Sequence, residues 1–130
     1  MMRALVVDDD QDTRVVLRLM LEDASYTVAE AADGIQTLDA LRTSVVPMVV
    51  LLDLDLPGID GIAVLRAVAD DAHLAARHAF ILLTAVQHSR YQAAADVCET
   101  LSVPLILKPF NMDTLLDAVA TAARHLPPTR

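Results

Sequence analysis

Short runs of consecutive apolar residues recur along the chain and alternate with stretches of helical periodicity. Five such runs cover Ala4 to Val7, Tyr26 to Ala29, Val45 to Leu52, Ala79 to Leu83 and Val103 to Leu107. Continuous apolar character over about four to eight residues is typical of strands buried on both faces, as in a parallel sheet. The pattern therefore predicts five strands, although prolines interrupt the third and the fifth run.

The segments between these runs carry apolar residues at helical intervals, which is typical of helices with one buried face. Each segment follows a residue type that caps helix N-termini, namely Asp12, Asp33, Asp60, Ser89 and Asn111. The alternation of strand and helix predicts an α/β fold. In it, right-handed crossovers wind helices over both faces of a five-stranded, doubly wound parallel sheet.

The chain has 130 residues, which corresponds to one domain with a single core. No internal repeat or flexible linker divides the sequence. We expect one domain over residues 1–126 and a short C-terminal tail over 127–130, with no effector domain. The apolar stretches are far shorter than the ~20 residues of a membrane span, and the N-terminus does not resemble a signal peptide. A cytoplasmic location without membrane insertion is therefore expected.

The charge balance is acidic, because 18 Asp and Glu residues stand against 10 Lys and Arg residues, giving a formal net charge of −8. Direct nucleic acid binding is disfavoured, because phosphate contacts need clustered basic side chains. Cys98 is the only cysteine and cannot form an intramolecular disulfide. It falls on the apolar face of the fourth predicted helix, where we expect a small buried hydrophobe. We expect solvated side chains at the four histidines, His73, His78, His88 and His125.

Acidic and polar residues stand where four of the predicted strands end. They are Asp8 and Asp9 after the first strand, Asp53 and Asp55 after the third, Thr84 after the fourth and Lys108 after the fifth. Ligands of open parallel sheets collect at the carboxyl ends of the strands. Several carboxylates meeting there favour a hard divalent cation such as Mg²⁺, which in turn recruits phosphate oxygens. The alternative to a cation site is that these aspartates only cap the helices that follow them, but capping accounts for only one Asp in each loop.

Four segments carry a resemblance to a known family. They are Val6-Val7-Asp8-Asp9-Asp10, the stretch from Val50 to Gly61, Leu82-Leu83-Thr84-Ala85, and Leu107-Lys108-Pro109-Phe110. In this order and spacing they resemble the motifs of the receiver domain of bacterial two-component response regulators. The resemblance covers essentially the whole chain. It implies a flavodoxin-like (βα)5 fold with the strand order 2-1-3-4-5.

The resemblance also implies a phosphoacceptor and a metal site. Asp53 would accept a phosphoryl group from a partner histidine kinase or histidine phosphotransfer protein. Asp9, Asp53 and the backbone carbonyl of Asp55 would bind Mg²⁺ or Mn²⁺, and Asp8 would hold the ion through water. The chain would then be a signalling domain of a phosphorelay, with self-phosphorylation and self-dephosphorylation as its only reactions, and not an enzyme.

Two further site residues follow from the same resemblance. Thr84 would donate a hydrogen bond to one phosphoryl oxygen, and Lys108 would pair with another. The bond between Lys108 and Pro109 is expected to be cis. The output would be a switch in contacts with a downstream protein target, or a homodimer, through the face formed by the fourth helix, the fifth strand and the fifth helix.

The sequence departs from the family pattern at two positions. Leu105 stands where many receivers have the Tyr or Phe that turns inward on phosphorylation, so the output face is expected to move less or differently. Asp55 adds a carboxylate beside the phosphoacceptor, and we hypothesise that it tunes the lifetime of the acyl phosphate.

Two other functions are compatible with parts of this pattern. Asp53-Leu54-Asp55 is similar to the nucleophile motif of haloacid-dehalogenase-like phosphatases, although in these the acidic pair comes late in the chain and a cap domain covers the substrate. The second alternative is a pseudo-receiver, an interaction module that works without phosphorylation. The replacement at Leu105 keeps that alternative open, whereas the complete set of site residues argues against it.

Overall fold

The computed structural model describes residues 2–128. Its strands are β1 (Arg3–Val7), β2 (Thr27–Ala31), β3 (Met48–Asp53), β4 (Ala79–Ala85) and β5 (Leu105–Lys108). Its helices are α1 (Gln11–Asp23), α2 (Gly34–Thr43), α3 (Gly61–Ala69), α4 (Ala72–Arg77), α5 (Tyr91–Leu101) and α6 (Met112–Arg124). Within the described residues the strands form one parallel sheet in the order β2-β1-β3-β4-β5. This order confirms the predicted fold class.

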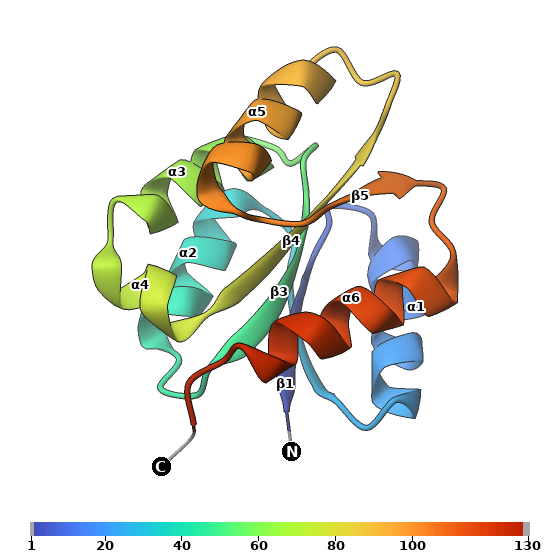
Figure 1. Ribbon diagram of the computed structural model, residues 1–130. Helices are drawn as coiled ribbons and strands as arrows, with labels where there is room; N and C mark the ends of the chain where they lie inside the picture. The colour runs from blue at the N-terminus through green and yellow to red at the C-terminus, as the bar shows by residue number, and fades with distance from the viewer. Residues whose placement is uncertain (1, 129–130) are drawn as a thin grey trace.

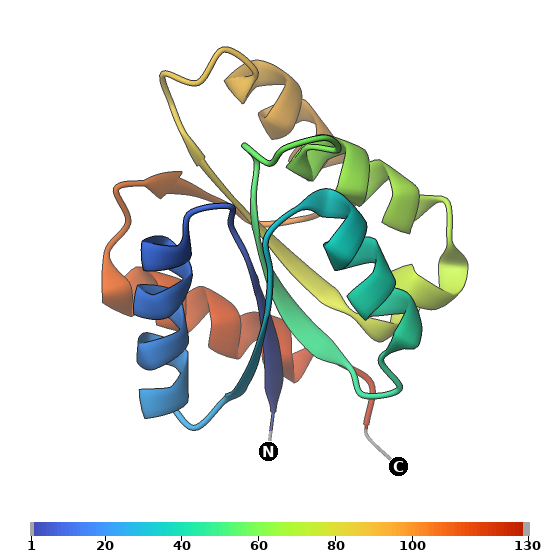
Figure 2. The ribbon, with the colours of Figure 1, turned by 180° about the vertical axis from the view of Figure 1, so that it is seen from behind.

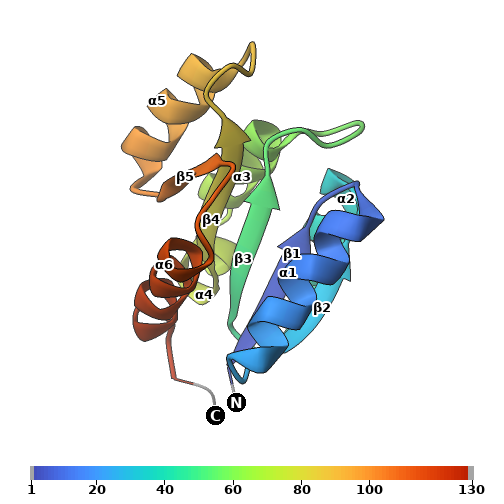
Figure 3. The same cartoon turned by 90° about the vertical axis from the view of Figure 1, so that its right-hand side faces the viewer.

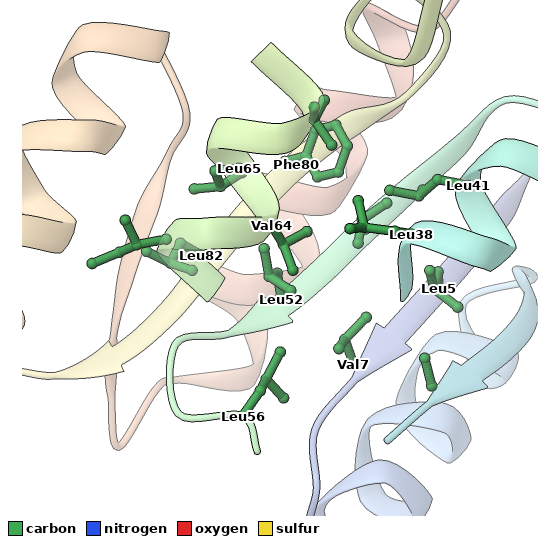
Figure 4. Packing of buried hydrophobic residues seen from close by; sticks show 14 of the residues in the cluster. Leu5, Val7, Leu38, Leu41, Leu52, Leu56, Val64, Leu65, Phe80 and Leu82 are labelled. Carbon is green, nitrogen blue, oxygen red and sulfur yellow. The ribbon is translucent and has the colours of Figure 1, made fainter. Parts of the chain in front are cut away.

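Alternate residues of the central strands enter two separate hydrophobic clusters. Val50 and Leu52 of β3 face the cluster that α2, α3, α4 and α5 cover, whereas Val49 and Leu51 face the cluster under α1 and α6. Figures 1 and 2 show these two helix layers from opposite sides, and Figure 3 shows the sheet between them. Figure 4 shows the first cluster at close range, with side chains of β1, β3 and β4 packed against α2 and α3. Burial on both faces explains why these strands have continuous apolar sequences.

Some predicted boundaries were wrong. Both prolines precede their strands, because β3 begins at Met48 and β5 at Leu105; a proline cannot donate a hydrogen bond to a sheet ladder. The short helix α4 was not predicted at all. Asp10, and not Asp12, caps α1, since its side chain accepts a hydrogen bond from the Asp12 amide.

The expectation for His78 was also wrong, because this side chain is buried with 5% exposure. His78 directly precedes β4, and its ring lies within hydrogen-bond distance of the backbone amide of Met48 and the backbone carbonyl of Leu41. Cys98 is buried as predicted, and burial raises the pKa of its thiol. The predicted tail of 127–130 includes residues 129 and 130, which lie outside the described residues. Among residues 2–128, no helix is long and apolar enough to cross a membrane.

Candidate functional site

The carboxyl ends of β1, β3 and β5 bring the predicted site residues together. Asp53 is the last residue of β3, Lys108 is the last residue of β5, and Asp8 directly follows β1. One carboxylate oxygen from each of Asp8, Asp9 and Asp53 lies within 4.8 Å of the others. Because neighbouring strands of a parallel sheet end at one edge, residues separated by many positions in sequence share this small region.

Lys108 connects two of these carboxylates. Its Nζ donates a hydrogen bond to Oδ1 of Asp53 over 2.9 Å and lies 3.6 Å from Oδ2 of Asp8. The Lys108–Pro109 peptide bond is cis, as predicted. Burial on its own lowers the pKa of Lys108, but the carboxylates of Asp53 and Asp8 outweigh burial and raise it. The side chain therefore stays a cation.

Asp53 is buried with 5% exposure, which suits a carboxylate whose reactivity depends on its neighbours. Burial is the largest influence on its pKa, which is raised above the ordinary value despite the opposing hydrogen bond and charge of Lys108. The negative charge of Asp8 raises the pKa further. A cation placed among these carboxylates would reverse that balance and keep Asp53 ionised as a nucleophile.

Asp8 supplies the observation that favours a cation here. Its Oδ1 accepts a hydrogen bond from the Asp10 amide over 2.9 Å. Its Oδ2 is buried and, among the residues that the structure describes, has no hydrogen-bond partner, since Lys108 is beyond hydrogen-bond distance. A buried carboxylate oxygen that accepts no hydrogen bond is costly, and the ion pair with Lys108 at 3.6 Å offsets this cost only in part. Carboxylate oxygens are the ligands that Mg²⁺ prefers, so the residues present fit such an ion.

The remaining predicted site residues flank this group. Thr84 lies near the end of β4 with 2% exposure, and its hydroxyl donates a long hydrogen bond of 3.4 Å to the carbonyl of Ala85. The hydroxyl is therefore available to a better acceptor. Asp55 lies beyond the end of β3 with an exposed side chain. Its carbonyl as a metal ligand remains a prediction.

Position 61 must be a glycine for steric reasons, which was not predicted from the sequence. A Cβ atom at this position would lie 2.8 Å from the carbonyl oxygen of Asp53 and 2.9 Å from Cδ1 of Leu82. The first turn of α3 can therefore approach the end of β3 only if residue 61 has no side chain. The sequence contains the clue, because Gly61 directly follows the helix cap Asp60.

Comparison with known proteins agrees with this geometry. The family model described as the response regulator receiver domain matches residues 4–120. The chain belongs to this family. The receiver domain is a signalling domain of two-component systems, so the predicted family is confirmed and the phosphatase alternative loses its support.

Individual relatives cover most of this receiver domain. The chain is 36% identical over 126 residues to Protein CcdB of Bacillus subtilis, covering 96% of this chain and 100% of that protein. It is 31% identical to sporulation initiation phosphotransferase F of the same species, with 90% of each covered. A CheY-like receiver structure from Methanospirillum hungatei has a TM-score of 0.80 at 30% identity, over 94% of both chains. Other relatives are longer, and the chain covers 24–25% of their length.

Proposed function

We propose that this receiver accepts a phosphoryl group on Asp53 from a phosphohistidine of a partner kinase or phosphotransfer protein. An oxygen of the Asp53 carboxylate attacks phosphorus, the bond between phosphorus and the histidine nitrogen breaks, and the ring leaves with the electron pair and takes up a proton from water to become neutral imidazole. The product is an acyl phosphate on Asp53. The observation that carries this proposal is the buried Asp53 carboxylate paired with Lys108 beside two further carboxylates.

The surrounding residues supply charge and orientation for this transfer. Asp8, Asp9 and Asp53 would hold Mg²⁺ or Mn²⁺ together with the Asp55 carbonyl, and the ion would neutralise phosphoryl oxygens. Lys108 moves its ammonium from the Asp53 carboxylate to a phosphoryl oxygen as that carboxylate loses its charge. The Thr84 hydroxyl donates to a second phosphoryl oxygen. Phosphoryl transfer depends mainly on positioning and charge neutralisation, so this set of groups suffices.

Helix α1 offers a docking surface for the phosphoryl donor. Val15, Val16 and Leu19 on this helix are apolar yet 43%, 58% and 62% exposed. The helix starts three residues after Asp8, so a partner bound to this surface would be close to the acidic site. Apolar surface beside a reactive centre is typical of transient protein contacts. A histidine kinase or phosphotransfer protein in the cytoplasm fits this position.

The proposed output surface consists of α5, β5 and α6. Helices α5 and α6 correspond to the fourth and fifth helices predicted from the sequence, because the short helix α4 was not predicted. Leu105 at the start of β5 packs against the cluster under α5 and takes the position of the usual switch aromatic. Val86 after β4 and Leu107 on β5 are 57% and 41% exposed. Movement of Thr84 toward the phosphoryl group would shift the loop that carries Val86, and so change the apolar surface presented to a downstream protein or to a second copy of the chain.

The test uses a small phosphoryl donor and mass spectrometry of the intact chain. Acetyl phosphate with Mg²⁺ should add one phosphoryl group to the wild type and none to Asp53→Asn. The matched control Asp55→Asn keeps the phosphoacceptor and should still be labelled. Chelation of Mg²⁺ should abolish labelling of the wild type. Unlabelled wild type with both acetyl phosphate and phosphoramidate would instead support a receiver that works without phosphorylation.

A further inference from the structure

We propose that Arg14 is a positioning residue for the cation site, which it serves by holding the backbone of the loop that presents Asp8 and Asp9. The inference rests on the proposed function, because it concerns the same cation. Arg14 belongs to α1 and its side chain is 16% exposed. None of its atoms needs to touch the ion for this role.

The guanidinium of Arg14 makes two contacts in different directions. Its Nη1 donates a hydrogen bond to the backbone carbonyl of Asp8 over 2.6 Å. Its Nε donates to Oε1 of Glu30 over 3.0 Å, which is also an ion pair. Glu30 lies on β2, the strand beside β1. Residues 8–10 connect β1 to α1 and form the acidic loop. Arg14 therefore links Asp8, the first residue of this loop, to the neighbouring strand β2 as well as to α1.

Three hydrogen bonds restrain the backbone and side chain of Asp8. Its amide donates to the carbonyl of Ala31 over 3.2 Å, its carbonyl accepts from Arg14, and its Oδ1 accepts from the amide of Asp10. The remaining oxygen of the side chain is Oδ2, which lies 3.6 Å from Nζ of Lys108. The three restraints aim this oxygen at the site, so loss of one of them should let the carboxylate turn away.

An arginine suits this position for a geometric reason. The planar guanidinium can donate to a carboxylate and to a carbonyl at once, whereas a lysine ammonium on its flexible stem would favour the charged partner. The electrostatic effect of Arg14 has the opposite sign, because a cation close to the site repels Mg²⁺. Weaker Mg²⁺ binding after removal of Arg14 would therefore report on position and not on charge.

Arg18 provides the matched control. It lies one turn further along α1, pairs with Oε2 of the same Glu30 over 3.0 Å, and donates to the carbonyl of Val28 over 2.9 Å. Within residues 2–128, its side-chain contacts lead only to β2 and not to the acidic loop. Removing Arg18 takes away the same charge and a similar link to β2, yet leaves the carbonyl of Asp8 held.

The experiment titrates MgCl₂ into the wild type, Arg14→Met and Arg18→Met by isothermal calorimetry, without a phosphoryl donor. Outer groups that support metal ligands typically contribute about 10- to 100-fold to metal affinity, and we expect a rise in Kd of about tenfold for Arg14→Met. Arg18→Met should bind as tightly as the wild type or more tightly. Melting curves without Mg²⁺ identify any variant that has lost its fold.

Arg14→Lys keeps the charge and the aliphatic stem, and it replaces Arg14→Met if the latter does not fold. It should also bind Mg²⁺ more weakly than the wild type, while Arg18→Lys should not. Unchanged or tighter binding in the folded Arg14 variants, or equal weakening in the Arg18 variants, would overturn the positioning role alone. Failure of the wild type to bind Mg²⁺ would instead count against the proposed function.

Discussion

Replacing His78 by alanine should remove a buried connection between three segments of the fold. Nδ1 of His78 accepts a hydrogen bond from the Met48 amide over 3.1 Å, and Nε2 lies 3.2 Å from the carbonyl of Leu41. The neutral ring with its hydrogen on Nε2 satisfies both backbone groups at once. The variant leaves an amide at the start of β3 and a carbonyl near the end of α2 without their partner.

The size of the effect follows from these two groups. Each buried backbone group left without a partner costs about 1–3 kcal/mol. His78 also lines a cavity of ≈ 620 Å³ between α3, α4 and α6, through which water can reach part of the vacated space. We therefore expect a loss of about 2–4 kcal/mol, which lowers Tm by roughly 6–16 °C for a domain of this size.

The contribution of His78 should also depend on pH. Burial lowers the pKa of this histidine below its ordinary value of 6.5, and the charge of Arg77 lowers it further. The unfolded chain therefore binds the proton more readily than the folded one. The stabilisation is complete above 6.5 and is lost progressively as the pH falls below that value, because a protonated Nδ1 would place a second donor against the Met48 amide.

Urea unfolding followed by circular dichroism at about pH 8 and about pH 5.5 measures both effects. The difference in unfolding free energy between the wild type and His78→Ala should be smaller at the lower pH. The control is His125→Ala, since His125 lines the same cavity but is exposed, and its ring lies within hydrogen-bond distance of the Thr121 carbonyl in the last turns of α6. A His78→Ala variant as stable as the wild type, or a difference in unfolding free energy that is the same at both pH values, would contradict this role of His78.

Three further predictions concern the site itself. Gly61→Ala should lose about 1–3 kcal/mol in urea unfolding and slow the labelling of Asp53, because its Cβ would press on the Asp53 carbonyl. Gly58→Ala is the control, since its φ is +74° but its Cβ meets no atom of the described residues within 4 Å; slow labelling there too would refute this explanation. Lys108→Arg should weaken beryllofluoride binding in a calorimetric titration by about tenfold or more, because a broad guanidinium replaces a compact ammonium; wild-type affinity would count against the role of Lys108. Asp55→Asn should speed phosphorylation by acetyl phosphate about two- to fivefold, since one repelling charge is removed, and unchanged rates of phosphorylation and dephosphorylation would show that Asp55 does not tune the site.

The architecture was predictable because the central strands are buried on both faces, and this leaves continuous apolar runs in the sequence. The same reasoning located Asp53 and Lys108, since residues at the carboxyl ends of parallel strands must meet at one edge of the sheet. The edge strand β5 was harder to delimit. Its residues are only partly buried, so the apolar run that extends back to Val103 does not mark where pairing begins.

Contacts between distant segments could not be predicted. His78 is buried because its ring bonds Met48 and Leu41, which lie 30 and 37 residues away. Nothing in the residues next to His78 distinguishes it from a solvated histidine. The role of Arg14 depends in the same way on Glu30, which is 16 residues further along the chain. Helix α4 escaped prediction because six residues are too few to show a clear periodicity.

Chemical mapping of the phosphorylated residue shows directly whether Asp53 is the phosphoacceptor. The chain is phosphorylated with acetyl phosphate and Mg²⁺, reduced with borohydride, digested and sequenced by mass spectrometry. Borohydride converts an aspartyl phosphate to homoserine, so we expect homoserine at position 53 and aspartate at positions 8, 9 and 55. Homoserine at one of those other positions, or at none in the chain, would contradict the assignment of Asp53 as the phosphoacceptor.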